Sequence, residues 1–249
     1  MLQIYLNGDS QTIGTDLYEN DASYALHLCD LLGGKCIANP AVGGASNERI
    51  LRTTNQMLDD CERNNESYPD FMIIGFTEWS RYDWFHNGKY RSANALQDGL
   101  GPEEVHADGN RLRYKWQYQH LSGEKAGNGQ INFYYNQMYN LHCRLEYLKI
   151  PHLFLNAHAG FYDDYGIEHR GNHRAEDLCE FDWYDCFWNV FATEDASFTS
   201  WAGIRGYKET SAGWHYEHQA HIDFAQVLYD YVQSKDLLNK YNPTSAGSL

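Results

Sequence analysis

The chain has 249 residues and a formal net charge of −15, with 34 acidic side chains against 19 basic ones. This charge argues against broad binding of nucleic acids, which needs a basic face, and against docking onto an anionic membrane surface. No apolar run approaches the about 20 residues of a membrane-spanning helix, and the first residues lack the basic flank and apolar stretch of a secretory signal. We therefore expect a cytoplasmic chain without a signal peptide.

Strands and helices alternate at short intervals in the first third of the chain. Apolar runs predict the strands, and apolar residues at helical spacing predict the helices. In chain order we predict a strand at 2–6, a helix at 20–32, a strand at 35–39, a helix at 46–61 and a strand at 71–74. This order predicts an α/β fold with a mostly parallel sheet and helices on both sides.

Two long polar, aromatic-rich segments interrupt this pattern. We interpret residues 77–130 and 157–214 as insertions in a single domain that spans residues 1–249. Between and after them the spacing predicts the remaining regular elements, a helix at 131–148, a strand at 151–156 and a helix at 217–234. The small, polar residues 242–249 are expected to form a frayed tail.

Small and polar residues occur where the predicted strands end. Gly8-Asp9-Ser10 follows the first strand, Gly43-Gly44 follows the second, residues 75–78 follow the third, and His215 precedes the last helix. Because ligands of an open parallel sheet bind at the carboxyl ends of its strands, we expect these groups at one edge. Acyl transfer needs a nucleophile, a base and N–H groups that stabilise an oxyanion. The sequence predicts these roles for Ser10, for His215, and for the N–H groups of Ser10 and Gly44.

Four of these sites resemble the sequence blocks of the SGNH (GDSL-type) hydrolase family. Gly8-Asp9-Ser10 looks like the first block, residues 39–46 the second, residues 75–78 the third, and His215 with the helix after it the fifth. The sites come in family order and span nearly all of the chain. The resemblance implies a three-layer α/β/α sandwich and a serine esterase, lipase or carbohydrate-deacetylase activity. It also implies that Gly44 and the third-block residue Thr77 contribute to the oxyanion hole.

Two positions depart from the family pattern. Thr77 stands where the family has an asparagine, and its hydroxyl can donate a single hydrogen bond. Ala212 stands three residues before His215, where the family usually has an aspartate that orients the imidazole. We therefore expect either a Ser–His dyad supported by a backbone carbonyl, or an acid from another position. Glu209 and Glu78 are the two candidates for this acid.

All seven tryptophans lie in the two insertions. Trp79 follows the third block and Trp214 precedes the candidate base, so we expect both to contact the substrate, together with Asp9 and Arg81. Flat aromatic rings suit stacking on sugars, contact with another protein, or the core of an enlarged loop region, and these three interpretations stay open. Arg81 can pair with a carboxylate of the substrate or with Glu78. Asp9 is also placed to shape the turn that carries the serine.

The cysteines and histidines show no metal-binding motif. The six cysteines include no CxxC pair, and we expect reduced thiols that mostly fill the core. The three-residue steps of His215, His218 and His221 favour solvated residues on a helix face over a shared ion. A second candidate cluster for a cation lies in the second insertion, with Asp163, Asp164, His169 and His173. We predict no metal and no cofactor.

Two hypotheses from different classes follow. The first is a serine ester hydrolase that removes acyl groups from a small-molecule or carbohydrate ester. The second is an SGNH-like domain without activity that binds glycans or proteins, or that assembles as a homo-oligomer or within a virion. Thr77 and Ala212 motivate the second hypothesis. The tryptophan-rich third block resembles that of chains of tailed bacteriophages, which implies a virion-associated location. Metal-dependent hydrolysis through the histidines is a third alternative.

Overall fold

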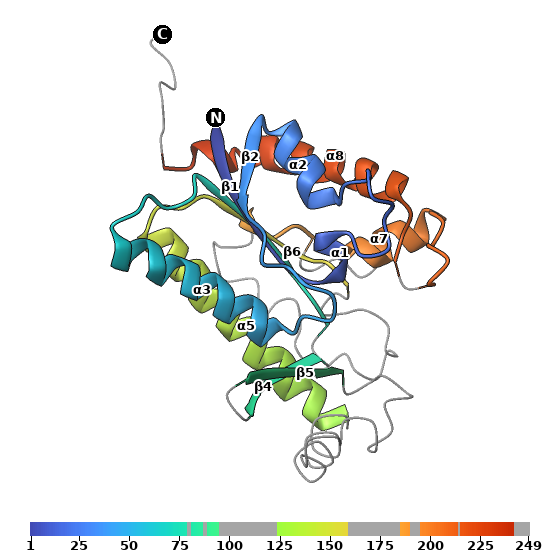
Figure 1. Ribbon diagram of the computed structural model, residues 1–249, viewed down its shortest axis with the longest axis horizontal. Helices are drawn as coiled ribbons and strands as arrows, with labels where there is room; N and C mark the ends of the chain where they lie inside the picture. The colour runs from blue at the N-terminus through green and yellow to red at the C-terminus, as the bar shows by residue number, and fades with distance from the viewer. Residues whose placement is uncertain are drawn as a thin grey trace.

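Four parallel strands form the central sheet. In the computed structural model the described residues are 1–78, 81–86, 89–94, 124–158, 185–189, 195–213 and 215–241. The strands are β1 (Leu2–Asn7), β2 (Gly34–Ala38), β3 (Phe71–Phe76) and β6 (His152–Asn156), in the order β2-β1-β3-β6. Ile4 lies opposite Phe71, and Met72 lies opposite His152. The predicted α/β fold with a parallel sheet is confirmed (Figure 1).

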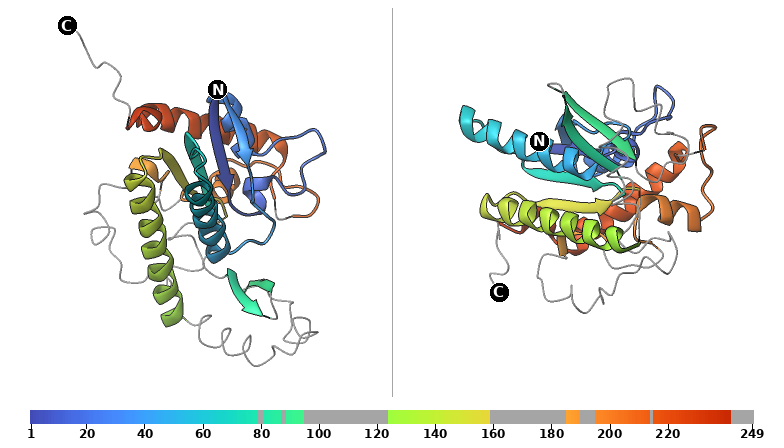
Figure 2. Two further views of the ribbon diagram at one scale, coloured as in Figure 1. Left: turned by 60° about the vertical axis from the view of Figure 1, so that its left-hand side comes forward. Right: turned by 90° about the horizontal axis from the view of Figure 1, so that it is seen from below.

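Helices cover both faces of this sheet. Helix α2 (Tyr24–Leu31) packs against α8 (His218–Ser234) on one side, and α3 (Asn47–Asn64) lies beside α5 (Glu124–Tyr147) on the other (Figures 1 and 2). The apolar faces of the helices and of the sheet are thereby buried against one another, and together they form the core. None of the helices described is both long and apolar enough to cross a membrane.

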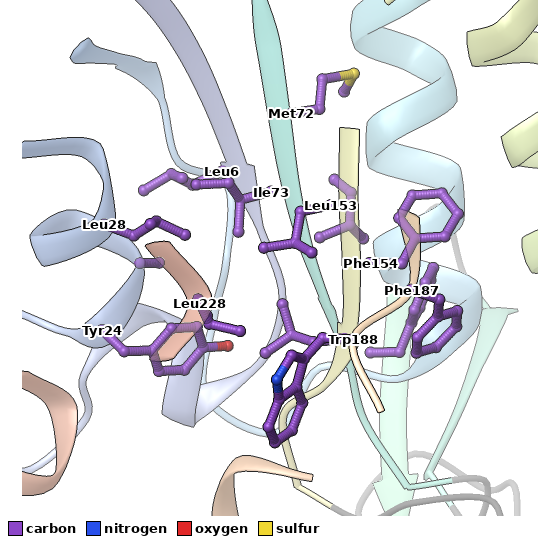
Figure 3. Packing of buried hydrophobic residues seen from close by; sticks show 14 of the residues in the cluster. Leu6, Tyr24, Leu28, Met72, Ile73, Leu153, Phe154, Phe187, Trp188 and Leu228 are labelled. Carbon is purple, nitrogen blue, oxygen red and sulfur yellow. The ribbon is translucent and has the colours of Figure 1, made fainter. Parts of the chain in front are cut away.

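The core lies between the sheet and its helices. All six residues of β3 are buried, as the continuous apolar run at 71–74 predicts for a strand covered on both faces. Figure 3 shows Tyr24 and Leu28 of α2 near Leu228 of α8 on one side of the strands, with Phe154 and Phe187 on the other. Strand β3, which ends at the candidate site, is therefore packed within the core.

The elements follow the predicted order, but several bounds differ, as in α2, which begins at Tyr24 rather than at residue 20. Helix α5 begins at Glu124, within the first predicted insertion, which also contains the hairpin of β4 (Arg81–His86) and β5 (Lys89–Asn94). Two short helices were not predicted as separate elements, α1 (Ser10–Ile13) and α7 (Phe198–Ile204). A 3-10 turn, η4 (Leu237–Asn239), follows α8. The second predicted insertion, residues 157–214, therefore contributes a regular helix, α7, to the fold.

Two tryptophans of the second insertion belong to the core. Trp188 and Trp201 are each 3 % exposed, and both pack against Phe224 of α8 with ring centroids 4.9 Å and 5.0 Å away. The N–H of Trp188 donates to the Phe154 carbonyl at 2.8 Å, which places this segment beside β6. Of the three open interpretations of the aromatic residues, these two rings fit the core of an enlarged loop region.

The fold predicts an acid-sensitive stability centred on His221 of α8. This histidine is fully buried, and its Nδ1 accepts a hydrogen bond from the Tyr24 N–H at 3.1 Å. Burial lowers the pKa of His221 from 6.5 to about 3, so the unfolded chain binds this proton at a higher pH than the native one. The free energy of unfolding should therefore fall as the pH drops below 6.5, by up to about 1.4 kcal/mol per pH unit from this residue.

Urea unfolding midpoints measured between pH 7 and pH 5 test this expectation. His142 and His152, whose pKa values are lowered to about 4 and about 3, act in the same direction. His221→Asn keeps an acceptor near the Tyr24 N–H but removes one titrating group, so the dependence on pH should become shallower without vanishing. An unchanged slope in this variant would contradict the assignment.

Candidate active site

Ser10 lies on a tight turn at the carboxyl end of β1. It is the first residue of α1, and Asp9 caps this helix by accepting from the Gln11 N–H at 3.0 Å. A Cβ at Gly8 would lie 2.8 Å from the Gly75 carbonyl oxygen, so a glycine is needed for the turn to approach β3 this closely. The N–H of a first helical residue has no partner within its own helix. The turn thus places Ser10 as the sequence predicts, and its catalytic roles stay predictions.

The second predicted oxyanion donor lies in a loop beside Ser10. A Cβ built on Gly43 would be 4.0 Å from the Ser10 Cβ. The next residue, Gly44, is exposed and has φ 71°, a left-handed conformation that glycine adopts without strain. The loop therefore brings the backbone around Gly44 to the candidate nucleophile, as expected from its position after β2.

His215 is held by a carboxylate. Its Nδ1–H donates to Asp16 Oδ2 at 2.6 Å, across 199 residues of sequence separation. The His215 side chain is 12 % exposed and that of Asp16 is 37 % exposed. With Nδ1 protonated and bonded, the other ring nitrogen, Nε2, is left as the basic atom. The pair has the composition of the base and its orienting acid in serine hydrolases.

The acid on His215 is neither of the two acids expected from the sequence. Glu78 Oε1 instead accepts from Arg81 Nε at 2.9 Å, and Glu209 is an exposed residue whose backbone bridges to Tyr216. Asp16 lies in the loop after α1, only six positions from Ser10, and has φ 68°. Aspartate is among the few residues that tolerate this left-handed backbone, and such strain is common at functional sites.

Asp9 is the centre of a buried charged network. The residue is fully buried, and its Oδ2 accepts from Thr77 Oγ1 at 2.9 Å and lies 3.4 Å from Arg81 Nη1. Arg81 joins Asp9 and Glu78 with a side chain that is 10 % exposed. The Asp9 carboxylate faces the protein, and the expected contact of Asp9 with substrate stays a prediction. Arg81 pairs with Glu78, one of its two predicted partners.

Thr77 does not have the free donor that an oxyanion hole requires. Its hydroxyl donates to Asp9, and its N–H donates to Asn47 Oδ1 at 2.9 Å. Asn47 also donates from Nδ2 to the Thr77 carbonyl at 2.9 Å, so both backbone groups are fixed. The predicted oxyanion role of Thr77 therefore conflicts with this geometry. The N–H groups of Ser10 and Gly44 are the two predicted donors that remain.

His158 is a site residue without a predicted role. It lies just beyond the carboxyl end of β6, and burial lowers its pKa. The charges of Asp9 and Glu78 raise this pKa, whereas those of Arg81 and His215 lower it further. The His158 ring thus lies within electrostatic range of charged groups from three parts of the chain, which follow β1, follow β3 and precede α8. The position of His158 directly after the strand predicted at 151–156 is the sequence feature that could have identified it.

The three histidines at three-residue steps face different partners. His215 contacts Asp16, His218 contacts Asp21 with Nδ1 at 3.0 Å and His27 with Nε2 at 2.8 Å, and His221 is buried against Tyr24. They do not share an ion site, and the prediction of solvated positions is wrong for His221. Six further candidate residues lie outside the described residues: Trp79, Asp163, Asp164, His169, His173 and Trp214.

Comparison with solved structures finds chains of similar structure. The chain is similar to the psychrotrophic esterase EstA from Pseudoalteromonas sp., with 11 % identity, 94 % of this chain and 98 % of that chain covered, and a TM-score of 0.48. No protein-family model matches the sequence. No curated protein matches it either.

Proposed function

We propose that this chain is a serine ester hydrolase in which Ser10, His215 and Asp16 form the catalytic triad. His215 Nε2 takes the hydroxyl proton as Ser10 Oγ attacks the carbonyl carbon of the ester. The N–H groups of Ser10 and Gly44 bind the oxyanion, and its collapse expels the alcohol, which receives the proton from His215. Water then attacks the acyl-serine by the same steps, which releases the acid and restores Ser10.

The contact between His215 Nδ1 and Asp16 Oδ2 carries this proposal. At 2.6 Å it is a charge-assisted hydrogen bond that fixes both the tautomer and the direction of the ring. The acid and the nucleophile come from one short segment, Ser10 to Asp16, which the close approach of Gly8 to β3 anchors. With a net charge of −15, the chain favours neutral acyl esters over strongly anionic substrates. Acetyl esters of carbohydrates belong to this class.

A fluorophosphonate probe tests the proposal directly. The reagent phosphonylates an activated serine, so we expect one equivalent of label on the Ser10 peptide by mass spectrometry. Ser10→Ala should take up no label and should lose hydrolysis of short acyl esters. Ser23→Ala is a matched control, because Ser23 is also a buried serine at the start of a helix, and this variant should be labelled on Ser10 as the wild-type chain is. Hydrolysis of an ester panel at equal rates by the wild-type chain and Ser10→Ala would overturn the proposal.

The geometry of Thr77 favours a second candidate function, a binding domain without activity. Both donors of this residue are engaged, so the third position of the oxyanion hole is missing its side-chain donor. Loss of one such donor slows acyl transfer by about 10²–10³-fold. Such a domain would bind glycans or proteins, as part of a homo-oligomer or a virion. Glycan-array binding by wild-type and Ser10→Ala chains, without any labelled serine, would support this second candidate over the first.

A further inference from the structure

A second cluster of reactive side chains lies near the start of β6, at the end of this strand opposite the candidate active site. His142 of α5, His152 at the start of β6, and Cys186 of the segment 185–189 place one ligand atom each within 4.8 Å of one another. All three residues are buried. His152 is the first residue of β6, whereas the candidate active site lies beyond the last, so the two sites are separate. Nothing in the proposed ester hydrolysis uses this cluster.

We propose that His142, His152 and Cys186 bind a zinc ion. Imidazole nitrogen and thiolate sulfur are the preferred ligands of zinc, which takes four of them in a tetrahedron. With ordinary bond lengths, two nitrogen ligands lie about 3.3 Å apart, and a nitrogen and a sulfur about 3.6 Å apart. The His142 Nδ1 and His152 Nε2 atoms are 2.9 Å apart, and Cys186 Sγ is 3.4 Å from His142 Nδ1. These two separations need to widen by a few tenths of an ångström, and all three ligand atoms already lie within 4.8 Å of one another.

The ring of His152 is already oriented for this role. Its Nδ1–H donates to the Ile150 carbonyl at 2.9 Å, which leaves Nε2 unprotonated and directed at His142. A backbone carbonyl behind a ligating histidine is the usual outer-shell arrangement of a zinc site. Burial also lowers the pKa of His142 to about 4 and that of His152 to about 3, so both rings are neutral at pH 7, as ligands must be.

Glu146 can complete the ligand set. It lies one helical turn after His142, with Oε1 4.0 Å from His142 Nδ1 and 2.6 Å from Lys240 Nζ. A thiolate and a carboxylate neutralise the two charges of zinc, which lowers the cost of holding the ion in a buried site. Burial raises the pKa of the Cys186 thiol to about 12, so the ion must displace its proton. The bound ion would connect α5, β6 and the segment that contains Cys186.

Cobalt(II) titration of the metal-free full-length chain tests this site. A thiolate ligand gives an intense charge-transfer band in the near ultraviolet, which should saturate at one equivalent and disappear when zinc displaces cobalt. Zinc at about 100 times its Kd should raise the Tm by about 5–10 °C for a chain of this size. Neither readout depends on ester hydrolysis, so failure here leaves the proposed function intact, and the reverse also holds.

The variants locate the site. Cys186→Ser should abolish the charge-transfer band and the Tm rise, whereas Cys143→Ser, which alters the exposed cysteine next to His142, should keep both. His152→Gln should lower the affinity for zinc. The loss should exceed the about 10–100-fold that follows removal of an outer-shell partner. If Cys186→Ser does not fold, zinc protection of Cys186 from alkylation in the wild-type chain decides the question. The proposal would be overturned if the wild-type chain showed no charge-transfer band, or if zinc did not protect Cys186 from alkylation. A band that persisted in Cys186→Ser would also overturn it.

Discussion

Asp16→Asn should lower kcat for short acyl esters by about 10²–10⁴-fold while KM changes little. The amide removes the negative charge that stabilises the imidazolium formed when His215 takes the serine proton. Because the Asp16 side chain is 37 % exposed, water offsets part of this loss, and we expect the lower half of the range. Asparagine also tolerates the left-handed backbone at this position, so the fold of the loop should persist. Steady-state kinetics on an acetyl ester measures the effect.

The chain contains a matched control for this variant. Asp21 contacts His218 at 3.0 Å, and this pair comes from the same two segments as Asp16 and His215. Asp21→Asn removes the same charge from a histidine to which the proposed mechanism gives no role, so kcat should stay within about twofold of the wild-type value. Equal losses in the two variants would mean that the change acts through the shared loop rather than through the base. Asp16 would then have no role as the acid of a triad.

The alternation of apolar strands and amphipathic helices predicts the sheet, because the apolar pattern of each segment reflects which of its faces are buried. A fully apolar run at 71–74 marks a strand covered on both faces, and β3 is buried throughout. Ser10 and the Gly43-Gly44 loop follow from the same logic, since residues after parallel strands meet at one edge. Helix α7 also had a local signal, a capping box in which Ser197 and Ser200 bond reciprocally, at 3.1 Å and 3.0 Å.

The pairings between distant segments left no pattern in the sequence. Asp16 meets His215 across 199 residues, and a loop aspartate has no periodicity that would single it out. His142, His152 and Cys186 come from a helix, a strand and a loop, so no fixed spacing of the CxxC kind relates them. Thr77 can be read as a free donor until the structure shows Asp9 and Asn47 beside it. Local sequence therefore predicts where candidate groups lie better than which groups touch.

Arg81→Met should destabilise the chain by about 3–5 kcal/mol, because it removes the cation from a buried network. The guanidinium contacts Asp9 at 3.4 Å and Glu78 at 2.9 Å, and the two carboxylate side chains are 0 % and 3 % exposed. Methionine fills a similar volume, so the loss measures charge rather than a cavity. The free energy of unfolding in urea, extrapolated to water, gives the value. Arg81→Lys should recover only part of it, since an ammonium group lacks the planar fork that reaches both partners.

Arg63→Met is the matched control, because Arg63 also pairs with a carboxylate three positions away on the chain. It contacts Asp60 at 2.8 Å, but the two side chains are 71 % and 43 % exposed. Pairs in water contribute about 0–1 kcal/mol, so this variant should be nearly neutral. A small loss in Arg81→Met would mean that the two carboxylates accept protons or water when the cation is removed. Asp9 would then keep its bonds with Thr77 Oγ1 and the Gln11 N–H.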